Sequence, residues 1–292
     1  MRGIAAELDY RRPAALDEAL ALLEREPGVW TPLAGGTDLL VLHEAGLLGP
    51  RRLLDVGALP ELRGILVRDG VLEIGAAASY AEIQEHPLVT HEAPLLAQAA
   101  RETGARAIQE RGTLGGNLAN ASPAADSVPA LIAHGAQLRL ASARGERLLP
   151  AEDFFLGYRR TALAPGELIV SIILPRGAAP VCWFRKVGTR RAQAISKVAL
   201  AAAGGWTETG LDCRIAVASV APIPLRCRET ENFLAFHAGE PRWQDGAALR
   251  LQDEIRPIDD LRSTAAYRRA VAENLLRAFL RRCEAARPWG AR

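Results

Sequence analysis

A stretch of small residues from Arg111 to Asp126 carries the groups best suited to hold a phosphate-bearing ligand. Glycines let a backbone turn through positive φ and let a phosphate approach the peptide N–H groups closely. Short amide and hydroxyl side chains add hydrogen bonds, and a carboxylate suits ribose or ribityl hydroxyls. The stretch supplies these groups from Gly112, Thr113, Gly115, Gly116, Asn117, Asn120, Ser122 and Asp126. A Gly-Asn turn in a polar surface loop is the alternative interpretation.

A second glycine loop lies earlier in the chain, at Pro32-Leu-Ala-Gly-Gly-Thr-Asp-Leu39. It matches neither the dinucleotide-binding pattern G-x-G-x-x-G nor a P-loop, because no Gly-Lys-Ser/Thr follows. The apolar residues after it predict a short helix whose N-terminus faces the loop and offers free N–H groups to a phosphate. Asp38 either caps this helix or contacts the ligand directly. Two separated loops of this kind are suited to clasp a pyrophosphate from both sides.

Apolar periodicity, capping residues and turn residues predict the elements that position these two loops. Helices are expected over residues 13–28, 39–45, 94–102, 124–133 and 229–236, and strands over 30–33, 52–56, 71–76, 168–174 and 211–220. Residues 137–140 and 147–149 predict a hairpin around Arg144-Gly-Glu. A capping box at Ser79-Tyr-Ala-Glu82 opens another helix. Ser263 is expected to cap a long final helix that buries Tyr267, Val271, Leu275 and Phe279.

The two glycine motifs resemble the flavin-binding motifs of the FAD-binding subunits of molybdenum hydroxylases. This family includes the flavin chains of xanthine dehydrogenase-like and carbon monoxide dehydrogenase-like enzymes. A third block, Phe154 to Ile169, is similar to the family pattern F-F-x-G-Y-R-x-T-x-L-x-P-x-E-L-L. The segments 184–198 and 259–269 also resemble the family, although Ala194 stands where its members often have Asp. The resemblance therefore extends over nearly the whole chain.

The resemblance implies an α+β fold in two parts. A FAD-binding domain of the vanillyl-alcohol oxidase/CO dehydrogenase flavoprotein type is expected over residues 1–176, and a smaller α+β C-terminal domain over 177–292. A length of 292 residues suits two domains. The segment 175–180 is rich in Pro, Gly and Ala and is the expected boundary.

The resemblance also implies that FAD binds non-covalently between the two glycine loops, with its isoalloxazine ring facing the C-terminal domain. N–H groups of the first loop and the Thr37 hydroxyl would hold the pyrophosphate, with Gly116 and Asn117 on its other side. Asp126 would hold ribityl or ribose hydroxyls. Ile169 and Lys186 would lie beside the flavin, although an Ile in a strand usually packs in a core. The residues expected to contact the cofactor are Pro32, Leu33, Ala34, Gly35, Gly36, Thr37, Asp38, Leu39, Thr113, Gly115, Gly116, Asn117, Asn120, Asp126, Ile169 and Lys186.

The implied function is that of an oxidoreductase subunit without catalytic side chains of its own, because the chemistry belongs to the flavin. A large partner chain would hold the molybdenum cofactor, and a small partner chain would hold 2Fe-2S clusters. Electrons would pass from those clusters through FAD to NAD or another acceptor, within a heterotrimer. A self-sufficient oxidase of the vanillyl-alcohol oxidase type is the alternative, although the five histidines form no recognisable catalytic cluster. A catalytically silent scaffold is disfavoured because both glycine loops are intact.

The amino-acid composition narrows the classes of partner and the cellular location that the protein could have. Hydrophobic content of 49%, charged content of 24% and a net charge of +2 indicate a globular chain without a nucleic-acid or membrane partner. Met1 to Tyr10 has no signal-peptide core, and the longest dense apolar run, 168–174, is too short to cross a bilayer. A cytoplasmic protein is therefore expected. The widely spaced cysteines, Cys182, Cys213, Cys227 and Cys283, suit buried thiols better than metal ligands.

Overall fold

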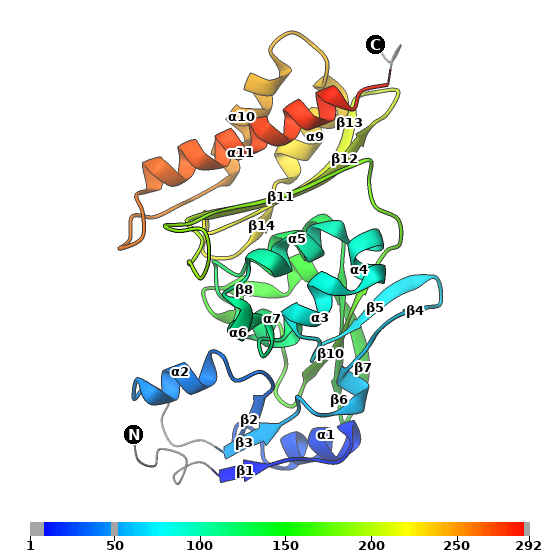
Figure 1. Cartoon of the computed structure of the whole chain (residues 1–292), viewed down its shortest axis with the longest axis vertical. Helices are drawn as coiled ribbons and strands as arrows, with labels where there is room; N and C mark the ends of the chain where they lie inside the picture. Colours follow the sequence, from blue (N-terminus) through cyan, green and yellow to red (C-terminus); the bar gives the residue numbers. More distant parts are fainter. Residues whose placement is uncertain (1–8, 48–51, 289–292) are drawn as a thin grey trace.

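The computed structural model describes residues 9–47 and 52–288. Its sheets follow one another along the long axis of the molecule (Figure 1). A small N-terminal sheet lies at one end, a five-stranded sheet with short helices lies in the middle, and a four-stranded sheet lies at the other end. The expected α+β architecture is confirmed. Residues 1–8, part of the segment in which no signal peptide is expected, fall outside the described residues.

The N-terminal sheet is parallel and has the strand order β1-β3-β2. Its strands are β1 (Asp9–Arg11), β2 (Trp30–Leu33) and β3 (Arg52–Asp55). Helix α1 (Leu16–Arg25) buries an apolar face that includes Leu20 and Leu23, as its spacing predicts. The first glycine loop leaves the carboxyl end of β2 and enters α2 (Leu39–Glu44), a helix with no buried residue.

The five-stranded sheet is antiparallel, with the order β4-β5-β10-β6-β7. Its central strand β10 (Leu168–Leu174) is buried along nearly its whole length, which explains its continuous apolar sequence. The expected hairpin is confirmed as β6 (Gln137–Ser142) and β7 (Gly145–Pro150). The edge strand β4 (Ile65–Arg68) has no counterpart among the expected elements. It pairs with β5 (Val71–Gly75) across an Asp69-Gly70 turn with φ values of 50° and 80°, a tight hairpin signal.

Short helices and turns complete the middle of the molecule. The capping box is confirmed, because Ser79 Oγ accepts from the Glu82 N–H and the Glu82 carboxylate accepts from the Ser79 N–H. The helix expected over 94–102 is confirmed, whereas the one expected over 124–133 begins only at Ser127.

The elements of this middle part are α3 (Tyr80–Glu85), α4 (Pro87–Glu92), α5 (Pro94–Glu102), α6 (Arg106–Gln109), α7 (Leu114–Asn120), α8 (Ser127–Ala133), β8 (Phe155–Gly157), β9 (Arg160–Thr161) and the 3₁₀ turns Pro60–Leu62 and Ala151–Asp153.

The second glycine motif folds as helix α7, so its interpretation as a loop is wrong. Thr113 caps this helix by accepting the Gly116 N–H on its side-chain oxygen. Gly115 lies against the end of β5, where an added Cβ would lie 2.7 Å from the Cβ of Ala76. The glycine therefore serves close packing of a helix on a sheet in addition to any contact with a ligand.

The C-terminal sheet is antiparallel and has two covered faces. It contains β11 (Val181–Val187), β12 (Val198–Trp206), β13 (Leu211–Ala218) and β14 (Leu225–Arg226), in that order. Alternate residues of β12 from Val198 pack with the C-terminal helices, and those between them, from Ala199, join the core of the middle sheet and its helices. Successive side chains of a strand point to opposite faces, so the apolar run of β12 reflects burial on both sides.

Helices α9 (Arg228–His237), α10 (Trp243–Glu254) and α11 (Ala265–Ala285) cover the outer face of this sheet (Figure 1). The cap of α11 is Thr264 rather than the expected Ser263, because the Thr264 side chain accepts the Tyr267 N–H. Burial of Leu275 and Phe279 is confirmed, but Tyr267 is 44% exposed and Val271 is only half-buried. The helix is rotated relative to the expected face and also buries Arg268, Ala272, Leu276, Leu280 and Cys283.

No helix within residues 9–47 and 52–288 is both long enough and apolar enough to span a membrane. The four cysteines are free thiols, of which Cys213, Cys227 and Cys283 are buried and Cys182 is half-buried. In the same part of the chain, no group of three or more His, Cys, Asp or Glu side chains is placed to hold a metal ion.

Candidate functional site

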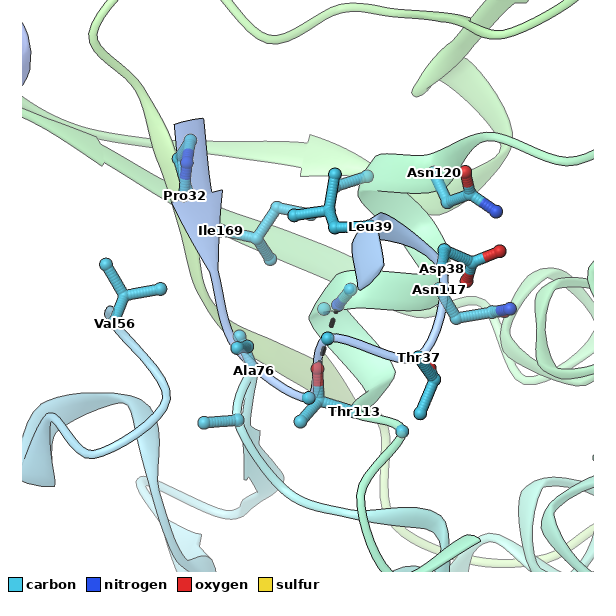
Figure 2. A pocket seen from close by; sticks show the side chains of 18 of the residues that line it. Pro32, Thr37, Asp38, Leu39, Val56, Ala76, Thr113, Asn117, Asn120 and Ile169 are labelled. Atoms are coloured by element: carbon cyan, nitrogen blue, oxygen red, sulfur yellow. Dashed lines mark hydrogen bonds between the residues drawn. The ribbon is translucent and has the colours of Figure 1, made fainter. Parts of the chain in front are cut away.

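A cavity of about 590 Å³ lies where the first glycine loop faces helix α7 (Figure 2). The loop lines one side, α7 lines another, and β10 contributes Leu168 and Ile169. Most of the expected site residues line this cavity, namely Pro32, Ala34, Gly35, Gly36, Thr37, Asp38, Leu39, Thr113, Gly115, Gly116, Asn117, Asn120 and Ile169. Two motifs that are far apart in the sequence thus meet at one concavity.

The first glycine loop packs directly on the backbone that leads into α7. A Cβ atom on Gly35 would lie 1.9 Å from the carbonyl oxygen of Arg111, so only glycine fits there. Gly36 has a φ of 75°, in the left-handed region that favours glycine. The two glycines therefore allow the close approach and the sharp turn that bring the loop to the cavity.

Four successive peptide groups of this loop are unpaired donors. In the described part of the chain, the backbone N–H groups of Ala34, Gly35, Gly36 and Thr37 have no hydrogen-bond acceptor. All four residues line the cavity. The four residues are half-buried, and successive free N–H groups beside a concavity are suited to bind an anion. The loop is therefore arranged for an anionic ligand such as a phosphate.

Helix α7 presents side chains to the cavity rather than free N–H groups. Its first N–H groups donate to Thr113 and to carbonyl oxygens after β5, at distances between 2.8 and 3.2 Å. Gly116 is expected to contact a pyrophosphate, but its N–H is one of these donors and is already used by the cap. The polar groups that α7 offers to a ligand are thus the side chains of Asn117 and Asn120 (Figure 2).

The rest of the cavity wall is largely apolar. Val56 and Leu62 lie on one part of it, and Leu168 and Ile169 on another. The pairing of β10 with β6 shifts register between Ile169 and Ser171. Such a bulge redirects side chains, and both Leu168 and Ile169 reach the wall. An apolar wall of this kind suits a flat aromatic ring system.

Three charged residues line the cavity: Asp38, Arg159 and Glu167. Glu167 is neutralised by Arg147, which donates two hydrogen bonds of 2.7 and 2.8 Å and lowers the pKa of the carboxyl group. Asp38 stands at the N-cap of α2 but makes no side-chain capping bond, so the capping alternative is wrong. Its carboxylate remains available to ligand hydroxyls.

The expected residues Leu33, Asp126 and Lys186 do not line the cavity. Asp126 and Lys186 form a buried ion pair of 2.6 Å, with side chains 9% and 6% exposed. Ser196 also donates to Asp126, and Lys186 donates to the carbonyl oxygen of Glu102 at 2.9 Å. Burial raises the pKa of Asp126, and Lys186 opposes that rise. Contact of these residues with a cofactor stays a prediction.

Several lining residues were not expected from the sequence. Tyr80 lies within the capping box, directly after Ser79, and Thr103 and Ile108 flank the α5–α6 connection. None of these three lies in a recognisable binding motif, since tertiary packing alone brings them to the cavity. Arg159 is different, because it stands in the block 154–169 whose family-like pattern could have identified it.

Family comparisons identify the ligand that this architecture holds. Residues 6–177 match a family described as the FAD-binding domain in molybdopterin dehydrogenase. The chain belongs to the FAD-binding subunits of the molybdopterin dehydrogenases. Residues 183–283 of this flavin subunit match the CO dehydrogenase flavoprotein C-terminal domain. The resemblance seen in the sequence and the expected fold class are both confirmed.

Relatives of the flavin subunit match almost its whole length. The carbon monoxide dehydrogenase medium chain of Hydrogenophaga pseudoflava is 32% identical over 282 residues, 95% of this chain and 97% of that one. The glyceraldehyde dehydrogenase medium chain of Sulfolobus acidocaldarius is 33% identical over 276 residues, 94% and 97% of the two chains. A solved structure of carbon monoxide dehydrogenase from H. pseudoflava superposes with a TM-score of 0.91 and 30% identity, covering 96% of this chain and 98% of the other. The flavin subunit is thus part of an oxidoreductase.

The cavity residues fit FAD. The unpaired N–H groups from Ala34 to Thr37 match a pyrophosphate, which needs donors close to its oxygens. Gly35 leaves no room for a side chain between the loop and Arg111. The apolar wall around Ile169 suits the ring system, and a volume of about 590 Å³ lies within the usual range of cofactor sites.

Proposed function

We propose that this subunit holds FAD non-covalently in the cavity and serves as the electron-transfer subunit of a molybdenum hydroxylase. Bound FAD supplies the chemistry of a two-electron carrier. The observation that supports the proposal most strongly is the row of unpaired N–H groups along a cavity closed by the two glycine motifs. Electrons would arrive from 2Fe-2S clusters of a small partner chain and leave to NAD or another acceptor.

Each side of the cavity has its own task in this proposal. The N–H groups from Ala34 to Thr37 and the Thr37 hydroxyl hold the pyrophosphate. Asp38 accepts hydrogen bonds from hydroxyl groups of the ligand, and Asn117 donates from the opposite side. Ile169 and its apolar neighbours exclude water from the ring system. Asp126 and Lys186 do not line the cavity, and we expect them to reach the ligand only if their ion pair opens.

The partners follow from the kind of protein that matches. The relatives are named medium chains of carbon monoxide dehydrogenase and glyceraldehyde dehydrogenase. We therefore propose a large partner chain that holds the molybdenum cofactor and a small partner chain that holds the iron–sulfur clusters. An interface of the obligate type would join them to this subunit.

Release and rebinding of FAD test the cofactor assignment. The purified protein is expected to be yellow and to release FAD on denaturation. Gly35→Ala places a Cβ 1.9 Å from the Arg111 carbonyl oxygen, so the loop must move and FAD binding should be lost. Gly157→Ala is the matched control, because a Cβ there meets nothing within 4 Å. A colourless wild-type protein that shows no FAD binding by calorimetry would contradict the proposal.

A further inference from the structure

Two hydroxyl groups of buried residues form a short hydrogen-bonded chain beside the cavity, which Tyr80 lines and Ser127 does not. Tyr80 Oη lies 3.3 Å from Ser127 Oγ, and Ser127 Oγ lies 2.7 Å from Asn117 Oδ1. Tyr80 and Ser127 are 2% and 0% exposed, whereas Asn117 is half-buried and lines the cavity. The three residues come from α3, α8 and α7, so three helices meet at this chain.

The direction of this chain follows from its hydrogens. An amide oxygen only accepts, so Ser127 donates its single hydrogen to Asn117 Oδ1 and must accept from Tyr80. Burial raises the pKa of Tyr80, which keeps its donor hydrogen at neutral pH. With the Asn117 amide turned round, Ser127 Oγ would accept from its NH₂ group, and the hydrogen of either Ser127 or Tyr80 would have no acceptor in the described part of the molecule. A buried donor without a partner is unfavourable.

We propose that Tyr80 and Ser127 are positioning residues that turn the NH₂ group of Asn117 into the cavity, where it donates to an acceptor oxygen of the bound cofactor. Within residues 9–47 and 52–288, no protein acceptor pairs with Asn117 Nδ2. The inference rests on the proposed function, since it takes FAD as the ligand. Pyrophosphate oxygens and ring carbonyl oxygens both accept hydrogen bonds from an amide.

A double-mutant cycle tests this positioning role. FAD is titrated into the cofactor-free forms of the wild type, Ser127→Ala, Asn117→Ala and the double variant. Ser127→Ala should weaken FAD binding about tenfold in the wild type but less than about twofold once residue 117 is Ala. Tyr80→Phe should act in the same way, with a loss of about threefold. If Ser127→Ala has the same effect in both backgrounds, the hydroxyl only supports the fold and the inference is overturned.

Asn117→Asp tests the direction of the chain. The new carboxylate still accepts from Ser127, but an oxygen replaces the NH₂ group that faces the cavity. FAD affinity should fall by tenfold or more, and an unchanged affinity would show that an oxygen faces the cavity in the wild type. Titrations with ADP and with riboflavin separate the two kinds of acceptor oxygen. If Asn117→Asp loses affinity for ADP, the acceptor is a pyrophosphate oxygen. If it loses affinity for riboflavin, the acceptor is a ring carbonyl oxygen. Unchanged affinity for both ligands contradicts the inference.

A buried hydroxyl elsewhere supplies the control. Ser171 is 2% exposed and donates to Glu73 at 2.7 Å, away from the cavity wall. Ser171→Ala should leave the FAD affinity within about twofold of the wild type, whatever it does to stability. If Ser127→Ala does not fold, Tyr80→Phe replaces it in the cycle with Asn117→Ala. A wild type that does not bind FAD overturns the proposed function. If the wild type binds FAD but the effects of the two substitutions on FAD affinity are additive, only this inference is overturned.

Discussion

Asp126 and Lys186 illustrate how a buried charge is tolerated in this molecule. Both side chains are less than a tenth exposed, and each neutralises the other across 2.6 Å. Removal of one partner from a buried pair leaves the other charge without compensation, which typically costs about 3–5 kcal/mol. The pair also joins the start of α8 to strand β11, and so connects the cavity region to the C-terminal sheet.

Lys186→Met should therefore destabilise the cofactor-free protein in a pH-dependent way. Only the Ser196 hydrogen bond would then oppose burial at Asp126, so its folded-state pKa should rise further above the unfolded value. The stability of the variant should be best preserved below pH of about 4 and be lost as the pH rises through the raised pKa. The deficit relative to the wild type should grow toward about 3–5 kcal/mol near neutral pH. Urea unfolding at a series of pH values measures it.

Two further variants separate the ion pair from a general effect of lysine removal. Lys186→Met with Asp126→Asn should recover most of the lost stability, because no buried charge remains. Lys197→Met removes a lysine whose ammonium lies 4.9 Å from the centre of the Tyr267 ring, and should cost no more than about 1 kcal/mol. A pH-independent deficit in Lys186→Met would argue that Asp126 is not the group left uncompensated.

At the scale of elements, the contact of α7 with the end of β5 determines the shape of the cavity. The Gly115 N–H donates to the Ala76 carbonyl oxygen at 2.8 Å, and a Cβ on Gly115 would lie 2.9 Å from that same oxygen. A side chain at this position would therefore push the helix away from its own hydrogen-bond partner. Because α7 carries Asn117 and Asn120, any such shift also moves the polar groups of the cavity.

Gly115→Ala should lower both stability and FAD affinity. Overpacking of this kind typically costs about 1–3 kcal/mol, and it exceeds the gain in helix propensity of up to about 1 kcal/mol. Thermal unfolding of the cofactor-free protein and FAD titration measure the two effects. Gly157→Ala should change neither, since a Cβ at Gly157 meets open space. Full FAD affinity in Gly115→Ala would show that the position of α7 does not control the site.

At the scale of the whole molecule, the middle and C-terminal sheets share one apolar core. Residues of α5 and α8 pack with Ala199 and Ala201 of β12 and with Ala216 of β13 in a single buried cluster. The first family match ends at residue 177, within the expected boundary segment 175–180, and the second begins at residue 183. The apolar core continues across this segment. The division into two domains, residues 1–176 and 177–292, stays a prediction from the sequence. The shared core predicts that the two parts unfold together.

A single cooperative transition is therefore expected in urea. Trp30 lies in the N-terminal sheet region, whereas Trp183, Trp206 and Trp243 belong to the C-terminal part. Fluorescence of a Trp30→Phe variant should follow the C-terminal part, and circular dichroism should follow the whole chain. Their midpoints should agree within about 0.2 M, as two-state unfolding requires. Two separated transitions would indicate that the shared core does not couple the parts.

Purification of the native complex tests the proposed partners. The subunit should co-purify with a large molybdenum-containing chain and a small iron–sulfur chain, because the proposed function requires electrons to reach the flavin from another protein. Mass spectrometry would identify the partners, and metal analysis would find molybdenum and iron. A chain that is present only as a free monomer in its native host would contradict the proposed role.

Local patterns in the sequence determined most of the elements of this protein. In three short stretches the local side chains are enough to predict the backbone conformation. These are the apolar spacing of α1, the capping box at Ser79 and the continuous apolar run of β10. The first glycine loop was also recognisable, because the close approach at Gly35 and the positive φ at Gly36 need glycine. The family motifs indicate FAD as the cofactor from the sequence alone.

Tertiary structure alone decided how the second motif folds and which groups face the cavity. Glycines disfavour a helix locally, yet Thr113 caps α7 and contact with Ala76 requires Gly115 to be small. The local Thr113 cap uses the Gly116 N–H, whereas tertiary packing buries Asp126 against Lys186 and places the Asn117 side chain at the cavity. The last two outcomes depend on partners outside the motif. Hydrogen bonds and burial are satisfied over the whole molecule, so no stretch of residues could determine them by itself.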